Sequence, residues 1–289
     1  MKLSLALGGG GSKGSAHIGV LRVLEREGHE VAAVAGTSIG GLIGAVYAFG
    51  LSPDEIEKRL AGTEFRQLFR REPGPHNSLL GLAGITELLT EVLGDTTFDE
   101  LRIPLAVTSL DIISGQEVIL KQGRVRDAVL ATIALPGIFP TQKWGDYELV
   151  DGGLCDPVPV AVARSLAPKL PVVAVALSKP PQPGRVLAYV NPLAPIPVLE
   201  RLSRLPVAQA FHIFTRSVFA SGRLLTEYRL QVENPALIIR PDVDHIGLLD
   251  RVDVRDISRL GEEAAERELP KLAAKGNWIQ RLAARVNQR

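Results

Sequence analysis

Short apolar runs alternate with segments of helical periodicity over the first 50 residues of the chain. The apolar runs have the length of buried strands, and the periodic segments place apolar side chains on one helix face. Glycine follows each periodic segment, at the position that commonly ends a helix. The pattern predicts strands over residues 3–7 and 31–35 and helices over residues 15–27 and 42–49. Strand, helix, strand, helix in this order indicates parallel βαβ units and an α/β fold class.

The same alternation continues through the rest of the chain. Ser52, Pro53 and two acidic residues mark the start of a third helix. Residues 64–84 are less regular and predict a long exposed loop, a candidate lid, and the proline-rich residues 179–206 predict a connection. Further helices are predicted over 85–93, 126–133, 207–225 and 256–286, and further strands over 103–112, 116–123, 148–153, 171–177 and 236–241. Residues 1–180 form the expected catalytic core, and residues 181–289 the connection and a helix-and-strand segment that completes the same domain.

Composition and charge narrow the classes of function. The 289 residues are 46% hydrophobic and 22% charged, as in ordinary globular proteins, and the net charge of +1 gives no general attraction to nucleic acid. The single cysteine, Cys155, excludes an intrachain disulfide and fits a reducing cytoplasm. No run of about 18 apolar residues predicts a membrane-spanning helix, and the apolar run at residues 3–7 is too short for a signal peptide. We therefore expect a cytoplasmic protein.

The glycine-rich loop that follows the first strand, residues 8–14, allows three interpretations. A phosphate-binding P-loop requires lysine after the last glycine, whereas Lys13 precedes Gly14. Gly9, Gly11 and Gly14 satisfy G-x-G-x-x-G, which is typical of dinucleotide-binding oxidoreductases, but the second strand does not end on the acidic residue that binds the ribose. In the third interpretation the loop amides form an oxyanion hole beside a nucleophile on the neighbouring strand.

That nucleophile is Ser38, within Gly36-Thr37-Ser38-Ile39-Gly40. The segment matches G-x-S-x-G at a predicted strand-to-helix junction, which is the context of a nucleophile elbow. A serine hydroxyl needs a base within hydrogen-bond reach. Two candidates remain open: Asp151, which ends an apolar strand before two glycines, and His245, which would complete a Ser-His-Asp triad as in α/β-hydrolases.

Four ordered segments of the sequence resemble the patatin-like phospholipase family. They are LALGGGGSKG (residues 5–14), GTSIGG (36–41), ATIALPGIFP (131–140) and LVDGG (149–153). The resemblance covers about the first 180 residues and implies a three-layer α/β/α fold with a mainly parallel central sheet. It also implies a serine acyl hydrolase that cleaves phospholipid or lysophospholipid esters through an acyl-serine. We expect no cofactor, and no metal, because the acidic clusters at 242–245 and 250–256 lack a recognised ligand spacing.

The resemblance assigns roles to residues of this chain. Ser38 would be the nucleophile and Asp151 the base of a Ser-Asp dyad, Gly9, Gly10 and Gly11 would supply oxyanion donors, and Lys13 would be the basic residue of that block. Asp156 stands where many relatives have asparagine, and its charge would raise the pKa of Asp151 if it faces the site.

Two other segments bear on the lipid substrate and on partners. Apolar residues within 186–202 and 207–214 either line an acyl groove or pack in the core or in a homo-oligomer interface. The basic, amphipathic residues 272–289 either dock on their own domain or lie peripherally on an anionic membrane.

Overall fold

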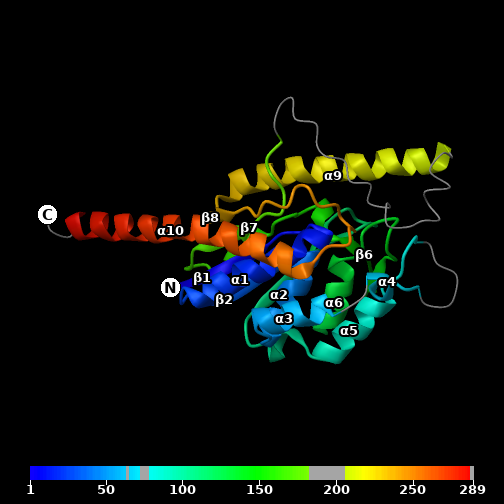
Figure 1. The fold of residues 1–289 in the computed structure, drawn as a ribbon, viewed down its shortest axis with the longest axis horizontal. Coiled ribbons are helices and arrows are strands. Elements are labelled where there is room, and N and C mark those ends of the chain that lie inside the picture. The colour runs from blue at the N-terminus through cyan, green and yellow to red at the C-terminus, as the bar shows by residue number, and fades with distance from the viewer. Residues whose placement is uncertain (63–64, 72–77, 182–205, 287–289) are drawn as a thin grey trace.

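The computed structural model describes residues 1–62, 65–71, 78–181 and 206–286, and within them an eight-stranded sheet runs through the molecule (Figure 1). Hydrogen-bonded pairs link the strands in the sequence β5-β6-β3-β2-β1-β7-β8, and β4 also pairs with β3. The strands are β1 (Lys2–Leu7), β2 (Glu30–Thr37), β3 (Leu105–Asp111), β4 (Glu117–Leu120), β5 (Gln142–Trp144), β6 (Tyr147–Asp151), β7 (Val172–Val175) and β8 (Leu237–Ile239).

The sheet is mixed, with its central strands parallel. β1, β2, β3, β7 and β8 pair in parallel, which confirms the prediction of a mainly parallel sheet. β4 and β6 run antiparallel to β3, and β5 forms a hairpin with β6 through Gly145, whose φ is 57°. The sequence pattern predicted no separate strand at β5, because three residues are too few to show alternation.

Helices cover both faces of the sheet. In Figure 1, α9 lies on the opposite side of the sheet from α3 and α5. The helices are α1 (Ala16–Arg26), α2 (Ile39–Phe49), α3 (Pro53–Ala61), α4 (Phe65–Leu68), α5 (Ala83–Leu93), α6 (Val125–Thr132), α7 (Val160–Leu166), α9 (Pro206–Glu233) and α10 (Val254–Val286), with 3-10 turns at η1 (Gly11–Ser15), η2 (Phe98–Glu100) and η3 (Gly152–Leu154). The structure is thus the expected three-layer α/β/α arrangement.

The two faces of the sheet carry side chains of different size. On β1 the residues Leu3, Leu5 and Leu7 belong to the large core formed with α1, α2, α5, α6 and α10. Alternate residues such as Ala6 and Ala35 face the opposite side, where small side chains let α7 and Leu230 of α9 pack closely. Because successive side chains of a strand point to opposite faces of the sheet, the position of a residue along the strand decides which layer of helices it packs against.

The carboxyl-terminal helix α10 packs directly on α1. A Cβ added to Gly19 of α1 would lie 1.9 Å from the carbonyl oxygen of Ser258, and one added to Gly261 would lie 1.9 Å from that of Ala16. These paired glycines allow the two helix backbones to approach closely. Arg22 of α1 forms ion pairs with acidic residues of α3 and with Glu262 of α10, so the contact joins three helices.

Some boundaries differ from the sequence prediction. α2 begins at Ile39, directly after Ser38, and α9 extends to Glu233. α7 was not predicted, because its seven residues follow two prolines and give only two turns of periodicity. Most of the proline-rich connection and part of the candidate lid lie outside the described residues. Across the described part of the chain, no helix combines the length and the apolarity that a membrane span requires.

Candidate active site

The sheet register brings Ser38 and Asp151 together. β4 pairs with residues 107–110 of β3, so it occupies one edge of that strand. β2 and β6 must therefore share the other edge, where β2 ends with Thr37 opposite Thr108 and β6 ends with Asp151 opposite Ser109. Because β2 is parallel and β6 antiparallel to β3, their carboxyl ends meet head to head at adjacent positions.

Ser38 and Asp151 form a direct hydrogen bond. The Ser38 hydroxyl donates to Oδ2 of Asp151 at 2.6 Å, and the amide of Gly153 donates to Oδ1 at 2.7 Å. Asp151 is only 5% exposed. Burial raises the pKa of its carboxyl to about 6, although both hydrogen bonds act in the opposite direction. A carboxylate with this pKa is ionised at neutral pH and is a stronger base than an ordinary aspartate.

The backbone at Ser38 has the conformation of a sharp strand-to-helix turn. Its φ of 55° and ψ of −127° are unusual for a residue with a side chain. The flanking glycines make the turn possible, because a Cβ on Gly36 would lie 2.5 Å from the carbonyl oxygen of Gly40. Thr132 holds the turn, because its Oγ1 accepts a hydrogen bond from the backbone amide of Ser38 at 2.9 Å. The serine hydroxyl therefore stands at the amino end of α2, where the helix dipole favours negative charge.

The glycine-rich loop lies against this turn. A Cβ added to Gly9 would lie 3.3 Å from the Cβ of Ser38, so glycine permits the close approach. The Gly9 amide donates to the carbonyl of Pro157 at 3.0 Å and is not free to meet an oxyanion. The amides of Gly10 and Gly11 have no hydrogen-bond partner within the described residues. The loop thus offers two donors, rather than the three that the resemblance implied.

None of the histidines whose side chains the structure describes forms a hydrogen bond with Ser38 or Asp151. His17 is fully buried, and its Nε2 bonds to the carbonyl of Gly8 at 2.8 Å, which anchors the glycine loop. Burial lowers the pKa of His17 to about 4, so the ring is neutral. His245, the candidate for a triad, is exposed and lines neither cavity at the dyad. His76 and the side chain of His212 lie outside the described part of the chain.

Lys13 and Asp156 lie near the dyad in different environments. Lys13 lines a cavity together with Ser38, and burial lowers the pKa of its ammonium group. Asp156 is fully buried and pairs with Arg229 of α9 at 3.3 Å. Its charge does not contribute to the raised pKa of Asp151, which comes from burial. Asp156 therefore acts in the packing of α9 rather than on the dyad.

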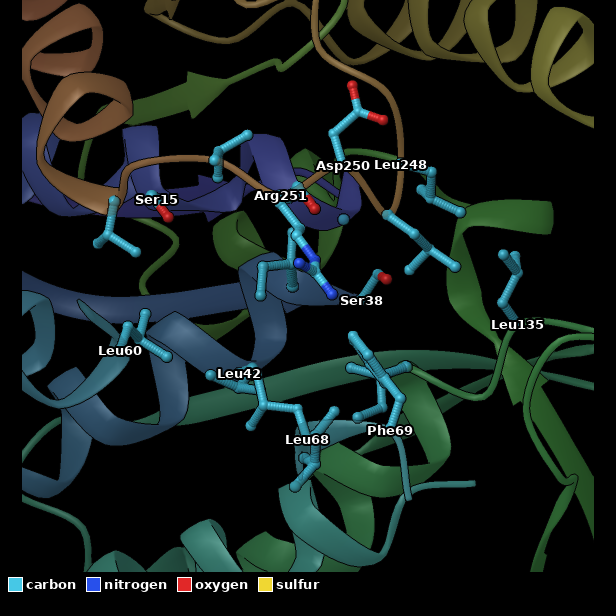
Figure 2. Close-up of a pocket in the computed structure, with 18 of the residues that line it drawn as sticks. Ser15, Ser38, Leu42, Leu60, Leu68, Phe69, Leu135, Leu248, Asp250 and Arg251 are labelled. Atoms are coloured by element: carbon cyan, nitrogen blue, oxygen red, sulfur yellow. The ribbon is translucent and has the colours of Figure 1, made fainter. Parts of the chain in front are cut away.

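A cavity of about 860 Å³ opens at Ser38 (Figure 2). Figure 2 shows Leu42, Leu60, Leu68 and Phe69 on one side of it, and Arg251 pointing toward Ser38 from the other. Its apolar wall is formed by α2, α3, α4, α5 and the segment after α6, through Ile39, Leu42, Leu60, Leu68, Phe69, Ile85, Leu88, Ile133, Leu135 and Phe139. Such a wall suits an apolar chain.

A second cavity of about 290 Å³ also contains Ser38 and Asp151. Lys13, Arg216 and Arg223 are among its lining residues, and the last two come from α9. Ile213 and Phe214 belong to a segment predicted either to line an acyl groove or to pack in the core or in a homo-oligomer interface. Both side chains are exposed and line neither cavity. The other such segment, residues 186–202, lies outside the described residues.

Sequence reasoning missed Thr132, Arg223 and Arg251. Thr132 follows the helical pattern of α6, and nothing in that pattern distinguishes a threonine that binds the elbow from one that packs in the core. The two arginines lie on a helix and on a loop far from the motifs in sequence. Only the folded chain places them at the cavities.

Comparisons with known proteins identify the family. The model of the patatin-like phospholipase family matches residues 5–164, which is more than half of the chain. An uncharacterized NTE family protein of Mycobacterium tuberculosis is 30% identical over 278 residues, covering 92% of this chain and 46% of its own length. Patatin-like phospholipase domain-containing protein 6 of Mus musculus is 32% identical over 174 residues, covering 58% of this chain and 13% of its own length.

The chain thus spans at most about half the length of these relatives. Among solved structures, VipD from Legionella pneumophila superposes with a TM-score of 0.56 at 13% identity, covering 94% of this chain and 66% of that one, which shows a shared fold. On the family match and this architecture, the chain belongs to the patatin-like phospholipase family.

Proposed function

We propose that this protein hydrolyses carboxylic esters of phospholipids or lysophospholipids, with Ser38 as nucleophile and Asp151 as base. The observation that carries the proposal is the 2.6 Å hydrogen bond between the Ser38 hydroxyl and the buried carboxylate of Asp151. A serine that donates directly to a carboxylate of raised pKa is prepared to lose its proton as it attacks. Membership of the family supports a lipid ester as substrate.

The first half of the reaction forms an acyl-serine. Oγ of Ser38 attacks the ester carbonyl carbon, and its proton passes to Oδ2 of Asp151. The carbonyl oxygen becomes an oxyanion, for which Gly10 and Gly11 supply the amide donors. One such donor is worth about 3 kcal/mol of barrier. Collapse of the intermediate breaks the bond to the alcohol oxygen, which leaves with the proton returned by Asp151.

The second half releases the fatty acid. Asp151 takes a proton from water as the water oxygen attacks the acyl-serine carbonyl carbon. The oxyanion again meets the amides of Gly10 and Gly11. Ser38 leaves with the proton from Asp151, which restores the dyad. The apolar wall of the larger cavity supports placement of the acyl chain there, with its carbonyl at Ser38.

Labelling with a fluorophosphonate tests the activated serine without knowledge of the natural ester. The probe is expected to modify Ser38, as mapped by mass spectrometry, and to leave S38A unlabelled. S15A is the matched control, because Ser15 lines the same cavity but bonds to no carboxylate among the residues that the structure describes, and this variant should be labelled normally. D151N should label at least about 100-fold more slowly, the lower range of a lost acid–base group. Labelling elsewhere, or undiminished in D151N, would contradict the dyad.

Membrane contact and self-association remain predictions from sequence. α10 extends to Val286, but its side chains beyond residue 272 lie outside the described part of the chain. Co-sedimentation with anionic vesicles, with and without residues 273–289, tests membrane contact. Analytical ultracentrifugation tests self-association.

A further inference from the structure

The smaller cavity beside the dyad differs in charge from the larger one. Both contain Asp151, but the smaller cavity is lined by three basic and two acidic residues. The larger cavity is lined by two basic and three acidic residues. An anion is therefore favoured in the smaller cavity, where it would lie next to the reacting serine.

Arg223 is one of the three cations that line the smaller cavity. Its side chain is only 17% exposed, and one terminal nitrogen donates to the carbonyl of Lys179 at 2.9 Å and to Asp244 at 3.1 Å. Its Nε is buried and has no hydrogen-bond partner within the described part of the chain. A buried donor without an acceptor is uncommon and costs free energy, so the described partners of Arg223 do not fully satisfy its guanidinium group.

Lys13 adds a second cation to the same cavity. No ion pair to its ammonium group occurs among the described residues, and Asp244 and Asp250 act on it through their charges without a direct contact. Asp244 binds Arg223, and Asp250 accepts the amide of Gly247 at 2.6 Å. Lys13 thus adds a cation to the cavity wall without a direct ion pair in the described part of the chain.

We propose that this cavity is an anion subsite, in which Arg223 binds the phosphate of a phosphate-bearing lipid ester while the acyl chain occupies the larger cavity. The inference rests on the proposed hydrolysis at Ser38 and specifies its substrate. Because Ser38 and Asp151 line both cavities, an ester bond held at the dyad has its acyl chain on one wall and its glycerol phosphate on the other. Arg223 is a specificity-determining residue and takes no part in proton transfer.

The test compares two esters with the same acyl chain, 1-oleoylglycerol 3-phosphate and 1-oleoylglycerol, both below their aggregation concentrations. The measured quantity is the ratio of kcat/KM for the phosphate ester to kcat/KM for the neutral ester. Wild-type protein should prefer the phosphate ester. R223Q should lower the ratio about ten- to hundredfold, the range of one lost hydrogen bond to a charged group. R223K should restore part of it, because lysine keeps the charge without the planar fork.

R240Q is the control for the docking of α9. Arg240 donates to the carbonyl of Ser178 and pairs with Glu227 of α9, much as Arg223 bridges Lys179 and α9, but it lines neither cavity. R240Q should leave the ratio unchanged. A fall equal to that in R223Q would mean that helix docking sets the ratio, and the subsite would be refuted.

R251Q tests the other cavity. Arg251 points toward Ser38 from the larger cavity (Figure 2), so it is the competing cation for a phosphate. If the ratio falls in R251Q and not in R223Q, the anion lies in the larger cavity and the proposal is wrong. A wild-type ratio near one would refute it as well.

A final comparison separates a lipid phosphate from free phosphate, and the subsite from the activity itself. Inorganic phosphate should inhibit hydrolysis of 1-oleoylglycerol only weakly. A different result would overturn the headgroup assignment: strong inhibition of the wild type by phosphate, no such inhibition of R223Q, and no preference of the wild type for the phosphate ester. Together these would indicate a site for free phosphate. If neither ester is cleaved in a manner that depends on Ser38, the proposed function fails. If both are cleaved equally, only the subsite fails.

Discussion

Replacing Asp151 with asparagine should abolish hydrolysis and, at neutral pH, make the protein more stable. The carboxyl is 5% exposed, and burial raises its pKa from 3.8 to about 6 in the folded protein. Asparagine has nearly the same shape and can keep the hydrogen bonds to Ser38 and to the amide of Gly153. The variant therefore removes the charge and little else.

The magnitude follows from the difference between the folded and unfolded pKa values. Because the folded pKa is the higher one, the unfolded state loses its proton first, and folding is disfavoured as pH rises from about 4 to about 6. Each pKa unit is worth about 1.36 kcal/mol, so an ionised Asp151 costs about 3 kcal/mol at pH 7. D151N should be more stable than wild type by up to that amount at pH 7 to 8 and equal to it near pH 4.

Urea denaturation of both proteins between pH 4 and pH 8 measures this difference. Other titrating groups, including the buried Asp156, are common to both proteins and cancel in the comparison. The kcat/KM of the wild type should rise with pH with a midpoint near 6, because only ionised Asp151 accepts a proton. A stability difference that does not change with pH, or a D151N protein that is less stable throughout, would refute the assignment of a buried carboxylate with a raised pKa.

Three further variants test the elbow, the helix contact and the acyl cavity. T132V removes the acceptor of the Ser38 amide and should lower kcat about tenfold or more by loosening the turn, as measured in steady-state kinetics; an unchanged kcat would contradict this role. G19A places a Cβ 1.9 Å from a carbonyl oxygen of α10 and should destabilise the protein by about 1–3 kcal/mol in thermal unfolding, whereas G62A, whose Cβ makes ordinary contacts, should be nearly neutral. L60W narrows the larger cavity and should lower kcat/KM for long acyl chains more than for short ones in an ester series; an equal loss would place the chain elsewhere.

Much of the fold was predictable because its signals are local. The apolar run that contains Leu3, Leu5 and Leu7 predicts the strand β1. Ser52 and Glu55 form the capping box at which α3 begins. The short elements β5 and α7 gave no usable periodicity, and the antiparallel direction of β6 depends on pairing with β3 rather than on its own residues. Strand direction is a property of partners, so a single segment does not encode it alone.

The candidate site divides in the same way. Ser38 was recognisable because the glycines around it mark a turn that few sequences tolerate, and Asp151 because it ends an apolar strand before two glycines. The local pattern left the base open between Asp151 and His245. The register of β2 and β6 on one edge of β3 determines which of them reaches the serine.

The sequence by itself determined the family motifs, the α/β class and the residues able to supply a nucleophile and a base. These depend on residue type and on spacing within a few turns of chain. The tertiary structure decided that Ser38 contacts Asp151, that the amide of Gly9 donates to the carbonyl of Pro157, and that Arg223 lines the smaller cavity beside Ser38. The physical reason is that proximity, burial and hydrogen-bond satisfaction between distant segments exist only after the sheet has assembled.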